Sequence, residues 1–283
     1  MTVGQFYRSY LYAPASKPEL VLKALNSKAD CVVVDLEDAV HHDMKSQARD
    51  FISELLGSPT PKPILVRIND PHGTWGLKDI DAISSPNLVG VRVPKVASTD
   101  TVHLVANALA KNDCAAQIHL LIESAKGVSN ALAMATSNPR VTALSLGEAD
   151  LQSDLRVEDD EVMQFCRNAI VVAARAAGLK QPSQSVFPNT KDLDGLRIST
   201  EQAKKSGFFG RSIIHPTQID IVNETFTPTL EEVDQARELL EVYQEMQKTG
   251  NSVMALPNGD LLDPANIHYA QFQVAIFNQI NEN

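Results

Sequence analysis

The sequence contains few cysteines, and their spacing argues against two kinds of site. Cys31, Cys114 and Cys166 are odd in number and far apart, and no Cys-x-x-Cys pair occurs. Neither a disulfide framework nor a thiolate zinc site is therefore indicated. No His-x-x-x-His spacing points to zinc either. Three reduced cysteines, mostly packed in the interior, fit a cytoplasmic protein better.

Long apolar runs and basic clusters are also absent. No run approaches the roughly 18 apolar residues of a membrane span, and the N-terminus lacks the basic region and apolar core of a signal peptide. The net charge is -10 at pH 7. Lys and Arg form no cluster that could neutralise nucleic-acid phosphates. We therefore expect a cytoplasmic protein with neither a membrane nor a nucleic-acid partner.

What the sequence does contain is a regular alternation of strand-like and helix-like segments. Short apolar runs alternate with amphipathic stretches. The expected strands are 9–14, 31–36, 64–69, 89–95, 117–123, 141–150, 183–187 and 212–215. The expected helices between them are 17–28, 43–56, 75–83, 99–112, 124–137, 161–177 and 193–206. This order predicts an α/β fold, a (β/α)8 TIM barrel, because each parallel crossover needs its own helix.

The C-terminal part of the chain has a different pattern. We expect residues 1–224 to form the barrel with its active site, because no domain boundary is apparent before Thr225. A long charged helix, 230–248, then precedes a polar connector and a last helix from Asp263 onward. Residues 225–283 are too few for a domain. We expect a C-terminal helical extension that caps the barrel or packs on a neighbouring subunit.

Ionic side chains are expected at the carboxyl ends of the strands, where barrels of this kind build their active sites. These residues are Glu37, Asp38, Arg67, Asn69, Lys95, Glu123, Asp150 and His215. A carboxylate at the end of a buried strand is costly unless a cation meets it. Several ionic groups converging on one mouth therefore indicate a ligand-binding site.

Glu123 and Asp150 are the candidate metal ligands. They follow consecutive strands, and Mg²⁺ is commonly held by one or two carboxylates while waters and substrate oxygens fill its other positions. The alternative is helix capping, in which Ser124 or Asp150 caps the helix that follows.

Three further residues each have two interpretations. Arg67 lies in an apolar strand, so its guanidinium should bind either a substrate carboxylate or an ion-pair partner such as Glu37 or Asp38. Lys95 is either a Schiff-base lysine or, more commonly at such a position, an ion-pair partner. His215 is either an acid–base residue or a hydrogen-bonded structural histidine.

Over nearly its whole length the chain resembles the citrate lyase beta-subunit-like group of the HpcH/HpaI aldolase family. The resemblance is carried by RSYLYAP at 8–14, DLEDAV at 35–40, VRIN at 66–69, VPK at 93–95, IESAKG at 122–127, LGEADL at 146–151 and GFFGRSIIHPTQI at 207–219. Each piece is weak alone, but their order and spacing together are specific.

The resemblance implies a Mg²⁺-dependent lyase that breaks a carbon–carbon bond in a β-hydroxyacyl thioester. Citryl-, malyl- and citramalyl-CoA are such substrates, and the products are acetyl-CoA and an oxo-acid. By resemblance, Glu123 and Asp150 hold the metal and Arg67 binds the carboxylate of the oxo-acid half. Glu37 and Asp38 are then expected to order a water or polarise Arg67.

The resemblance also implies contacts with the rest of the substrate. Arg8 and Lys95 are expected to bind substrate, and the backbone amides near Gly147 and Glu148 to bind a carboxylate. Asp263 of the C-terminal tail is expected to reach the active site of a neighbouring subunit, in a homotrimer. The expected partner is an acyl-CoA or an acyl-carrier-protein thioester.

Two stretches depart from the family pattern. The sequence has Pro-Ala-Ser at 14–16 where Pro-Gly-Asp is usual, and an acid common in the family is missing at 182–184. The acyl group and its carrier are therefore open. Three alternatives to the lyase also remain: a thioesterase or malate-synthase-like activity at the same site, a Schiff-base aldolase that uses Lys95, and a non-catalytic assembly subunit.

Overall fold

The computed structural model describes residues 6–249 and 267–281. Within these, Tyr7–Glu224 form one compact unit, and Phe6 with residues 225–249 and 267–281 forms a second. Asp263 lies outside the described residues, so its expected catalytic role stays a prediction.

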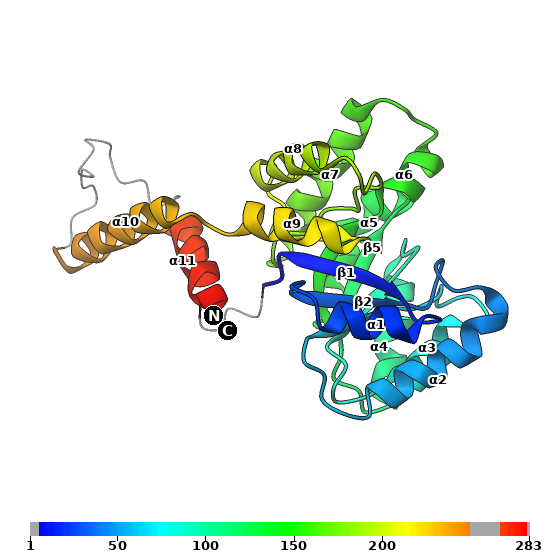
Figure 1. The fold of residues 1–283 in the computed structure, drawn as a ribbon. Coiled ribbons are helices and arrows are strands. Elements are labelled where there is room, and N and C mark those ends of the chain that lie inside the picture. The colour runs from blue at the N-terminus through cyan, green and yellow to red at the C-terminus, as the bar shows by residue number, and fades with distance from the viewer. Residues whose placement is uncertain (1–5, 250–266, 282–283) are drawn as a thin grey trace. The chain divides into compact units, whose positions relative to one another are not determined.

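A parallel sheet forms the centre of the first unit (Figure 1). Its strands are β1 Ser9–Pro14, β2 Cys31–Asp35, β3 Ile64–Arg67, β4 Gly90–Val93, β5 Gln117–Ile122, β6 Val141–Leu146 and β7 Arg211–Ile213. They pair in the order β6-β5-β4-β3-β2-β1-β7. Ser183 bridges to Ser145 on β6, and Gln184 bridges to Arg211 on β7, so the sheet closes on itself.

The expected barrel is thus confirmed, but its seventh strand is reduced to these two bridges. Pro182 and Pro188 flank the segment, and proline has no N–H to donate to a neighbouring strand. The sequence pattern overestimates this strand for that reason.

Helices lie along the chain between the strands. They are α1 Pro18–Leu25, η1 His42–Met44, α2 Lys45–Leu55, α3 Gly76–Ile83, α4 Thr99–Lys111, α5 Ala125–Thr136, α6 Glu148–Leu155, α7 Asp160–Ala176, α8 Leu193–Lys205, η2 Pro216–Gln218 and α9 Ile219–Phe226. Three differ from the sequence prediction: η2 and α9 are additional, and α6 begins where a strand is expected. Gly147 ends β6, and Glu148 and Asp150 then favour a helix because acids stabilise a helical first turn.

The core of the barrel follows the sequence pattern closely. Every residue of β2 is buried, as expected for a β-branched strand covered on both faces. The outer helices bury one face each; α7, for example, buries Met163, Cys166 and Ile170 at helical spacing. The three cysteines are free and buried, which agrees with their expected packing role.

One cation, Arg92 on β4, lies inside the barrel and is only 1% exposed. Its Nη1 donates to the hydroxyls of Tyr12 and Ser212, each at 3.0 Å. Its guanidinium carbon also lies 5.0 Å from the centre of the Tyr10 ring. Within the described part of the chain Arg92 forms no ion pair, so hydroxyls and aromatic faces stabilise its charge.

Buried His119 should make stability depend on pH. It pairs with Arg92 across β4 and β5, and burial, helped by the charges of Arg92 and Lys180, lowers the pKa of His119 to about 3. The unfolded chain binds this proton near pH 6.5 and the folded chain does not. Stability should therefore fall by a few kcal/mol as the pH drops from about 6.5 towards 4. In His119→Leu, the melting temperature should fall less over this range; an unchanged slope would contradict the assignment.

The second unit contains α10 Leu230–Thr249 and α11 Ile267–Asn281, which pack against each other. Met246 and Ile267 form their shared buried cluster. The backbone N–H of Phe6 donates to Oε1 of Gln279 at 2.8 Å, which ties the start of the described chain to α11. The function of this unit as a lid stays a prediction.

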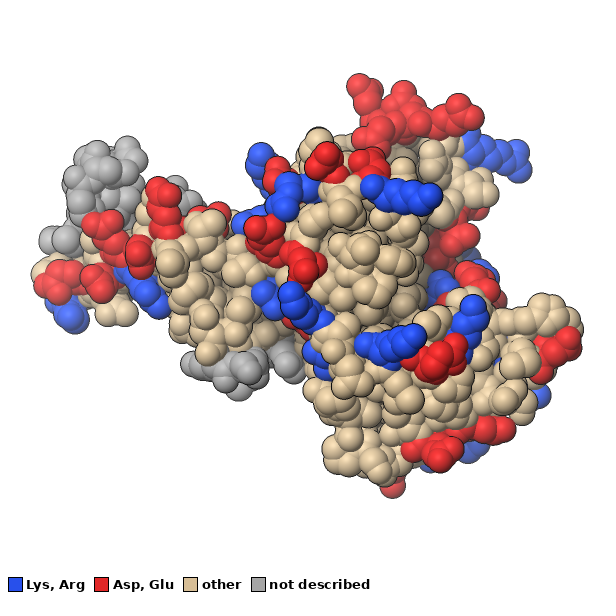
Figure 2. All heavy atoms as spheres, in the orientation of Figure 1, with Lys and Arg blue, Asp and Glu red and all other residues tan. Residues whose placement is uncertain are grey.

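The surface agrees with the acidic composition. On the face drawn in Figure 2, Lys and Arg are scattered among acidic side chains, and acids gather at the connection between α6 and α7. The exposed residues Glu158 and Asp159 lie in this connection, and the exposed residues Asp160 and Glu161 begin α7. None of the described helices has the length and apolar character needed to cross a membrane.

Candidate active site

An arginine–aspartate pair lies at the carboxyl ends of β2 and β3. Arg67, the last residue of β3, donates from Nε and Nη2 to the two carboxylate oxygens of Asp35 at 2.7 and 2.6 Å. The two residues are also register partners across the strands. The partners expected from the sequence, Glu37 and Asp38, are both near Nη1, at 3.1 and 3.5 Å. The bidentate geometry makes Asp35 the main partner, which the sequence interpretation missed.

Glu37 connects this pair to Lys95. It follows β2, is 4% exposed, and places Oε1 2.9 Å from Nζ of Lys95. Burial raises the pKa of Glu37 even though Arg67 and Lys95 favour its charged form. The contact with Glu37 raises the pKa of Lys95. Lys95 therefore keeps its proton, which is the opposite of what a Schiff-base lysine needs.

Glu123 is a buried carboxylate that follows β5. Its Oε1 accepts a hydrogen bond of 2.6 Å from the backbone N–H of Lys95, which has a left-handed φ of 53°. Burial, and then the charges of Glu37 and Asp150, raise the pKa of Glu123 to about 8. The hydrogen bond from Lys95 and the charge of Arg67 do not offset the cost of burying this carboxylate. A further positive charge beside Glu123 would therefore be favourable.

Gly147 makes the position of Glu123 possible. A Cβ at residue 147 would lie 2.7 Å from Oε2 and 2.8 Å from Cβ of Glu123. The carboxylate therefore rests directly against the backbone at the start of α6. The amides here are engaged: the N–H of Gly147 donates to the carbonyl of Ile122, and that of Glu148 donates to Oγ of Ser185. The expectation that amides near Gly147 and Glu148 bind a substrate carboxylate stays a prediction.

Asp150 is exposed in the first turn of α6, two residues inside the helix and not at a strand end. Its charge reaches Glu123, since it contributes to the raised pKa of that residue. Capping does not account for Asp150, because Gly147 occupies the N-cap position of α6. Ser124 does cap α5, with Oγ accepting from the N–H of Gly127 at 3.1 Å.

Gly147→Ala should inactivate the protein without unfolding it. The added methyl must displace Glu123, since the two would approach within 2.8 Å. We expect kcat to fall about 100-fold, the order of loss that misplacement by about 1 Å causes. Steady-state kinetics and thermal melting of Gly147→Ala measure the two effects. Gly73→Ala, on a loop of the same mouth with less crowding, is the control, and equal losses in both variants would contradict this role for Gly147.

Lys45 and Asn69 hold the loop that carries Glu37. Nζ of Lys45 donates to the carbonyls of Leu36 and Glu37, both at 2.7 Å, and to Oδ1 of Asn69 at 2.6 Å. A cavity of about 170 Å³ opens beside them, and Glu37, Lys95 and Trp75 also line it. The role of Lys45 was missed because it lies on α2 and not at a strand end.

Two other candidate residues are not part of this cluster: Arg8 lies away from it, and His215 has a structural role. Arg8 precedes β1, at the opposite end of the barrel, where it forms an ion pair of 2.8 Å with Asp30. The structure therefore does not bring Arg8 to the site, and its expected contact with substrate is corrected. His215 caps η2, since its Nδ1 accepts from the N–H of Thr217; this is the structural interpretation.

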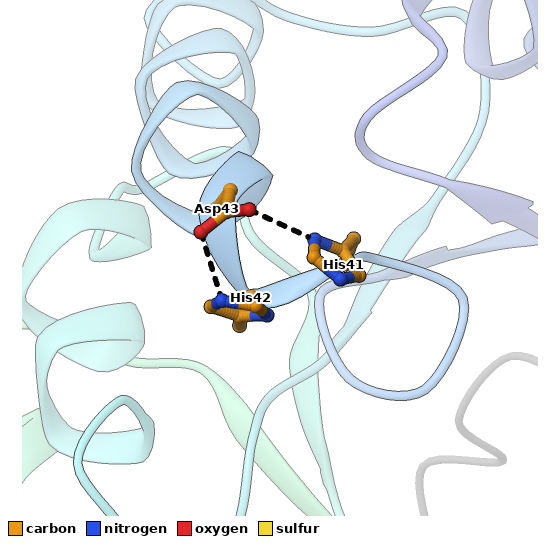
Figure 3. Close-up of side chains that lie close together, drawn as sticks. All are labelled: His41, His42 and Asp43. Atoms are coloured by element: carbon orange, nitrogen blue, oxygen red, sulfur yellow. Dashed lines mark ion pairs between the residues drawn. The ribbon is translucent and has the colours of Figure 1, made fainter.

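Another group of potential metal ligands lies on the surface. His41, His42 and Asp43 point towards one another at η1 (Figure 3), with ion-pair distances of 3.4 and 2.8 Å to the Asp43 carboxylate. All three side chains are more than 60% exposed. They are consecutive residues that already pair with each other, and the described residues provide no buried fourth group there.

Comparison with known proteins identifies the class. The family model described as HpcH/HpaI aldolase/citrate lyase matches residues 8–216. The chain therefore belongs to the HpcH/HpaI aldolase/citrate lyase family, which is an enzyme family, and the resemblance inferred from the sequence motifs is confirmed.

Individual relatives cover nearly all of the chain. A (3S)-malyl-CoA thioesterase of Cereibacter sphaeroides is 33% identical over 267 residues, which span 93% of this chain and 90% of the relative. A citrate lyase subunit beta of Leuconostoc mesenteroides is 31% identical, over 90% of this chain and 88% of the relative.

A solved structure with bound ligands is also similar. Protein CitE of Mycobacterium tuberculosis, in complex with magnesium, acetoacetate and coenzyme A, has a TM-score of 0.78 and 26% identity. The alignment covers 95% of this chain and 97% of that one. A citrate lyase of Burkholderia xenovorans, at 21% identity and a TM-score of 0.82 over 96% of this chain and 92% of that one, supports the fold.

Proposed function

We propose that the protein is a Mg²⁺-dependent carbon–carbon lyase that cleaves a β-hydroxyacyl-CoA thioester of the citryl, malyl or citramalyl type. The observation that carries the proposal is Glu123, a buried carboxylate whose pKa is raised to about 8 and whose place depends on the missing Cβ of Gly147. A bound cation would offset the cost of burying this carboxylate in its charged form. The magnesium-bound relative, the relative named as a malyl-CoA thioesterase and the relative named as a citrate lyase subunit support the proposal.

Glu123, which follows β5, and Asp150, in the first turn of α6, would hold the metal. Carboxylate oxygens are the ligands that Mg²⁺ prefers, and Glu37 adds negative charge to the same site. When bound, Mg²⁺ would supply a Lewis acid for the substrate's hydroxyl and carboxylate oxygens.

Arg67 would bind the carboxylate of the oxo-acid half. Its Nη1 faces Glu37 and Asp38, and Asp38 is 61% exposed, so this side of the guanidinium borders the mouth. The side held by Asp35 stays fixed. A substrate carboxylate would then meet an already oriented guanidinium.

The cleavage itself is a proton transfer coupled to bond breaking. The substrate hydroxyl loses its proton to a carboxylate or an ordered water, the carbon–carbon bond breaks, and its electron pair passes to the thioester enolate. The enolate then takes up a proton to give the acyl-CoA product. Glu37 and Asp38 would order the water, and we propose Asp263 of a neighbouring subunit in a homotrimer as proton donor.

Separate assays for free thiol and for oxo-acid test the proposal. A panel of 3-hydroxyacyl-CoA thioesters, incubated with and without Mg²⁺, should release oxo-acid without free thiol, and only with the metal. Release of thiol without oxo-acid would instead establish a thioesterase, which the named activity of one group of relatives favours. Neither product from any substrate would favour a non-catalytic subunit.

Lys95 should not form a Schiff base with substrate. Its ion pair with Glu37 stabilises the protonated amine, which cannot attack a carbonyl. Borohydride added with an oxo-acid should therefore leave the protein mass unchanged. A covalent adduct on Lys95 would overturn the proposed mechanism.

A further inference from the structure

A second cavity lies on the outside of the barrel, and none of its lining residues lines the mouth cavity. It has a volume of about 290 Å³ and is bounded by α7, α8 and the irregular segment 184–188. We call it the outer cavity. Such a volume equals that of about ten water molecules. It would hold a small organic acid and is too small for a CoA thioester.

Arg211 lines the outer cavity, and its nearest opposite charge is that of Glu148, which acts on it without forming an ion pair. The side chain is 2% exposed. It donates to the Ser185 carbonyl at 3.0 Å, the Thr200 hydroxyl at 2.6 Å and the Ser199 hydroxyl at 2.8 Å. All of these acceptors are neutral, and Arg211 forms no ion pair with the residues that the structure describes. Burial lowers the pKa of Arg211 to about 10, so the site favours an added negative charge.

Gln184 places an unused acceptor beside this cation. It is the bridge partner of Arg211 in the sheet and is 5% exposed. Its Oε1 has no hydrogen-bond partner among the residues that the structure describes, and Gln184 lines the outer cavity. A buried acceptor of this kind is costly unless a donor reaches it.

The other cation of the cavity wall is already neutralised. Arg167 donates to both carboxylate oxygens of Glu148, at 2.6 and 3.1 Å, and from Nη1 to Asp160 at 2.9 Å. An anion in the cavity would therefore be attracted to Arg211. The Phe187 ring, 5.9 Å from the Arg211 guanidinium carbon, provides an apolar wall.

We propose that the outer cavity binds a small carboxylate that carries a hydroxyl or amino group on the adjacent carbon. The carboxylate meets Arg211 and the Ser199 hydroxyl, and the adjacent group donates to Oε1 of Gln184. Neighbouring strands are about 4.8 Å apart, so the donor and the acceptor can contact adjacent groups of one small molecule. The carbon chain lies against Phe187.

Calorimetric titration of the full chain with L-lactate, L-alanine and propionate tests this site. EDTA is present throughout to suppress metal-dependent binding at the mouth. We expect lactate or alanine to bind at least 10-fold more tightly than propionate, which has no group to satisfy Gln184. Binding of all three with equal affinity, or of none, would overturn the proposal.

Gln184→Glu is the most informative variant, because its carboxylate can form an ion pair with Arg211 and so compete with the ligand. We expect at least a 10-fold loss of affinity for the tighter probe, with a melting temperature no lower than that of the wild type. Gln184→Leu should instead abolish the preference over propionate. Undiminished affinity in Gln184→Glu would contradict the site.

Two control variants distinguish binding in the outer cavity from binding elsewhere on the protein. Glu201→Gln, on the exposed face of α8 and outside the cavity lining, should leave binding unchanged. Arg67→Met should also leave it unchanged. If Arg67→Met abolishes binding, the probe occupies the mouth and the proposal for the outer cavity fails, whatever the outcome for the lyase activity.

Discussion

Glu123→Gln is expected to lower kcat by at least about a thousand-fold, even at saturating Mg²⁺. The change keeps the size of the side chain and its acceptor for the Lys95 amide but removes the charge that would hold the cation. A loss of about 4 kcal/mol in transition-state stabilisation corresponds to this factor. Turnover at several Mg²⁺ concentrations and calorimetric titration of Mg²⁺ measure the effect and its cause.

The fold should survive this change. Glutamine removes a carboxylate whose burial is unfavourable, so the melting temperature in EDTA should equal or exceed that of the wild type. Glu54→Gln, on the exposed side of α2, is a matched control that should change neither quantity. Full wild-type activity in excess EDTA would refute the role of the metal.

Arg67→Met should have the second largest effect, on both stability and activity. It leaves Asp35 buried without its bidentate partner, and breaking a buried ion pair in this way costs about 3–5 kcal/mol. For a unit of this size that corresponds to a decrease of roughly 10 °C in melting temperature. We expect kcat/KM to fall at least about 100-fold, because the substrate carboxylate loses its guanidinium.

A double variant separates the two effects. Adding Asp35→Asn to Arg67→Met removes the unpaired charge, so much of the stability should return while kcat/KM stays low. Arg67→Lys keeps the positive charge but lacks the planar guanidinium. Its stability and its kcat/KM should therefore lie between those of the wild type and Arg67→Met. If the double variant regains activity, Arg67 serves only the fold.

The sequence predicted the barrel and the strand-end position of most ionic residues because both depend on local patterns. Glu37, Arg67 and Glu123 each follow or end an apolar run, and parallel strands bring such ends together. Asp35 was missed as the partner of Arg67 because strand register, which the sequence does not reveal, decides which acid faces the guanidinium.

Other errors have different physical causes. The sequence pattern extends the sixth strand to Asp150, because the apolar run gives no sign that α6 begins after Gly147. The partner of the Glu148 amide comes from the distant residue Ser185, which no local pattern indicates. Arg8 precedes its strand, so chain direction alone places it at the amino end of the barrel, away from the carboxyl ends where the site lies.

The Arg67 cluster has one further consequence, for how the protein distinguishes ligands. Every side of this guanidinium is already in contact with carboxylates of the same chain or with the face of Tyr12. An incoming anion must therefore exchange places with Glu37 or Asp38 and gains only the difference between two similar contacts. A simple carboxylate such as acetate should gain little from that exchange. Discrimination between ligands would then come from the ligand's additional oxygen atoms.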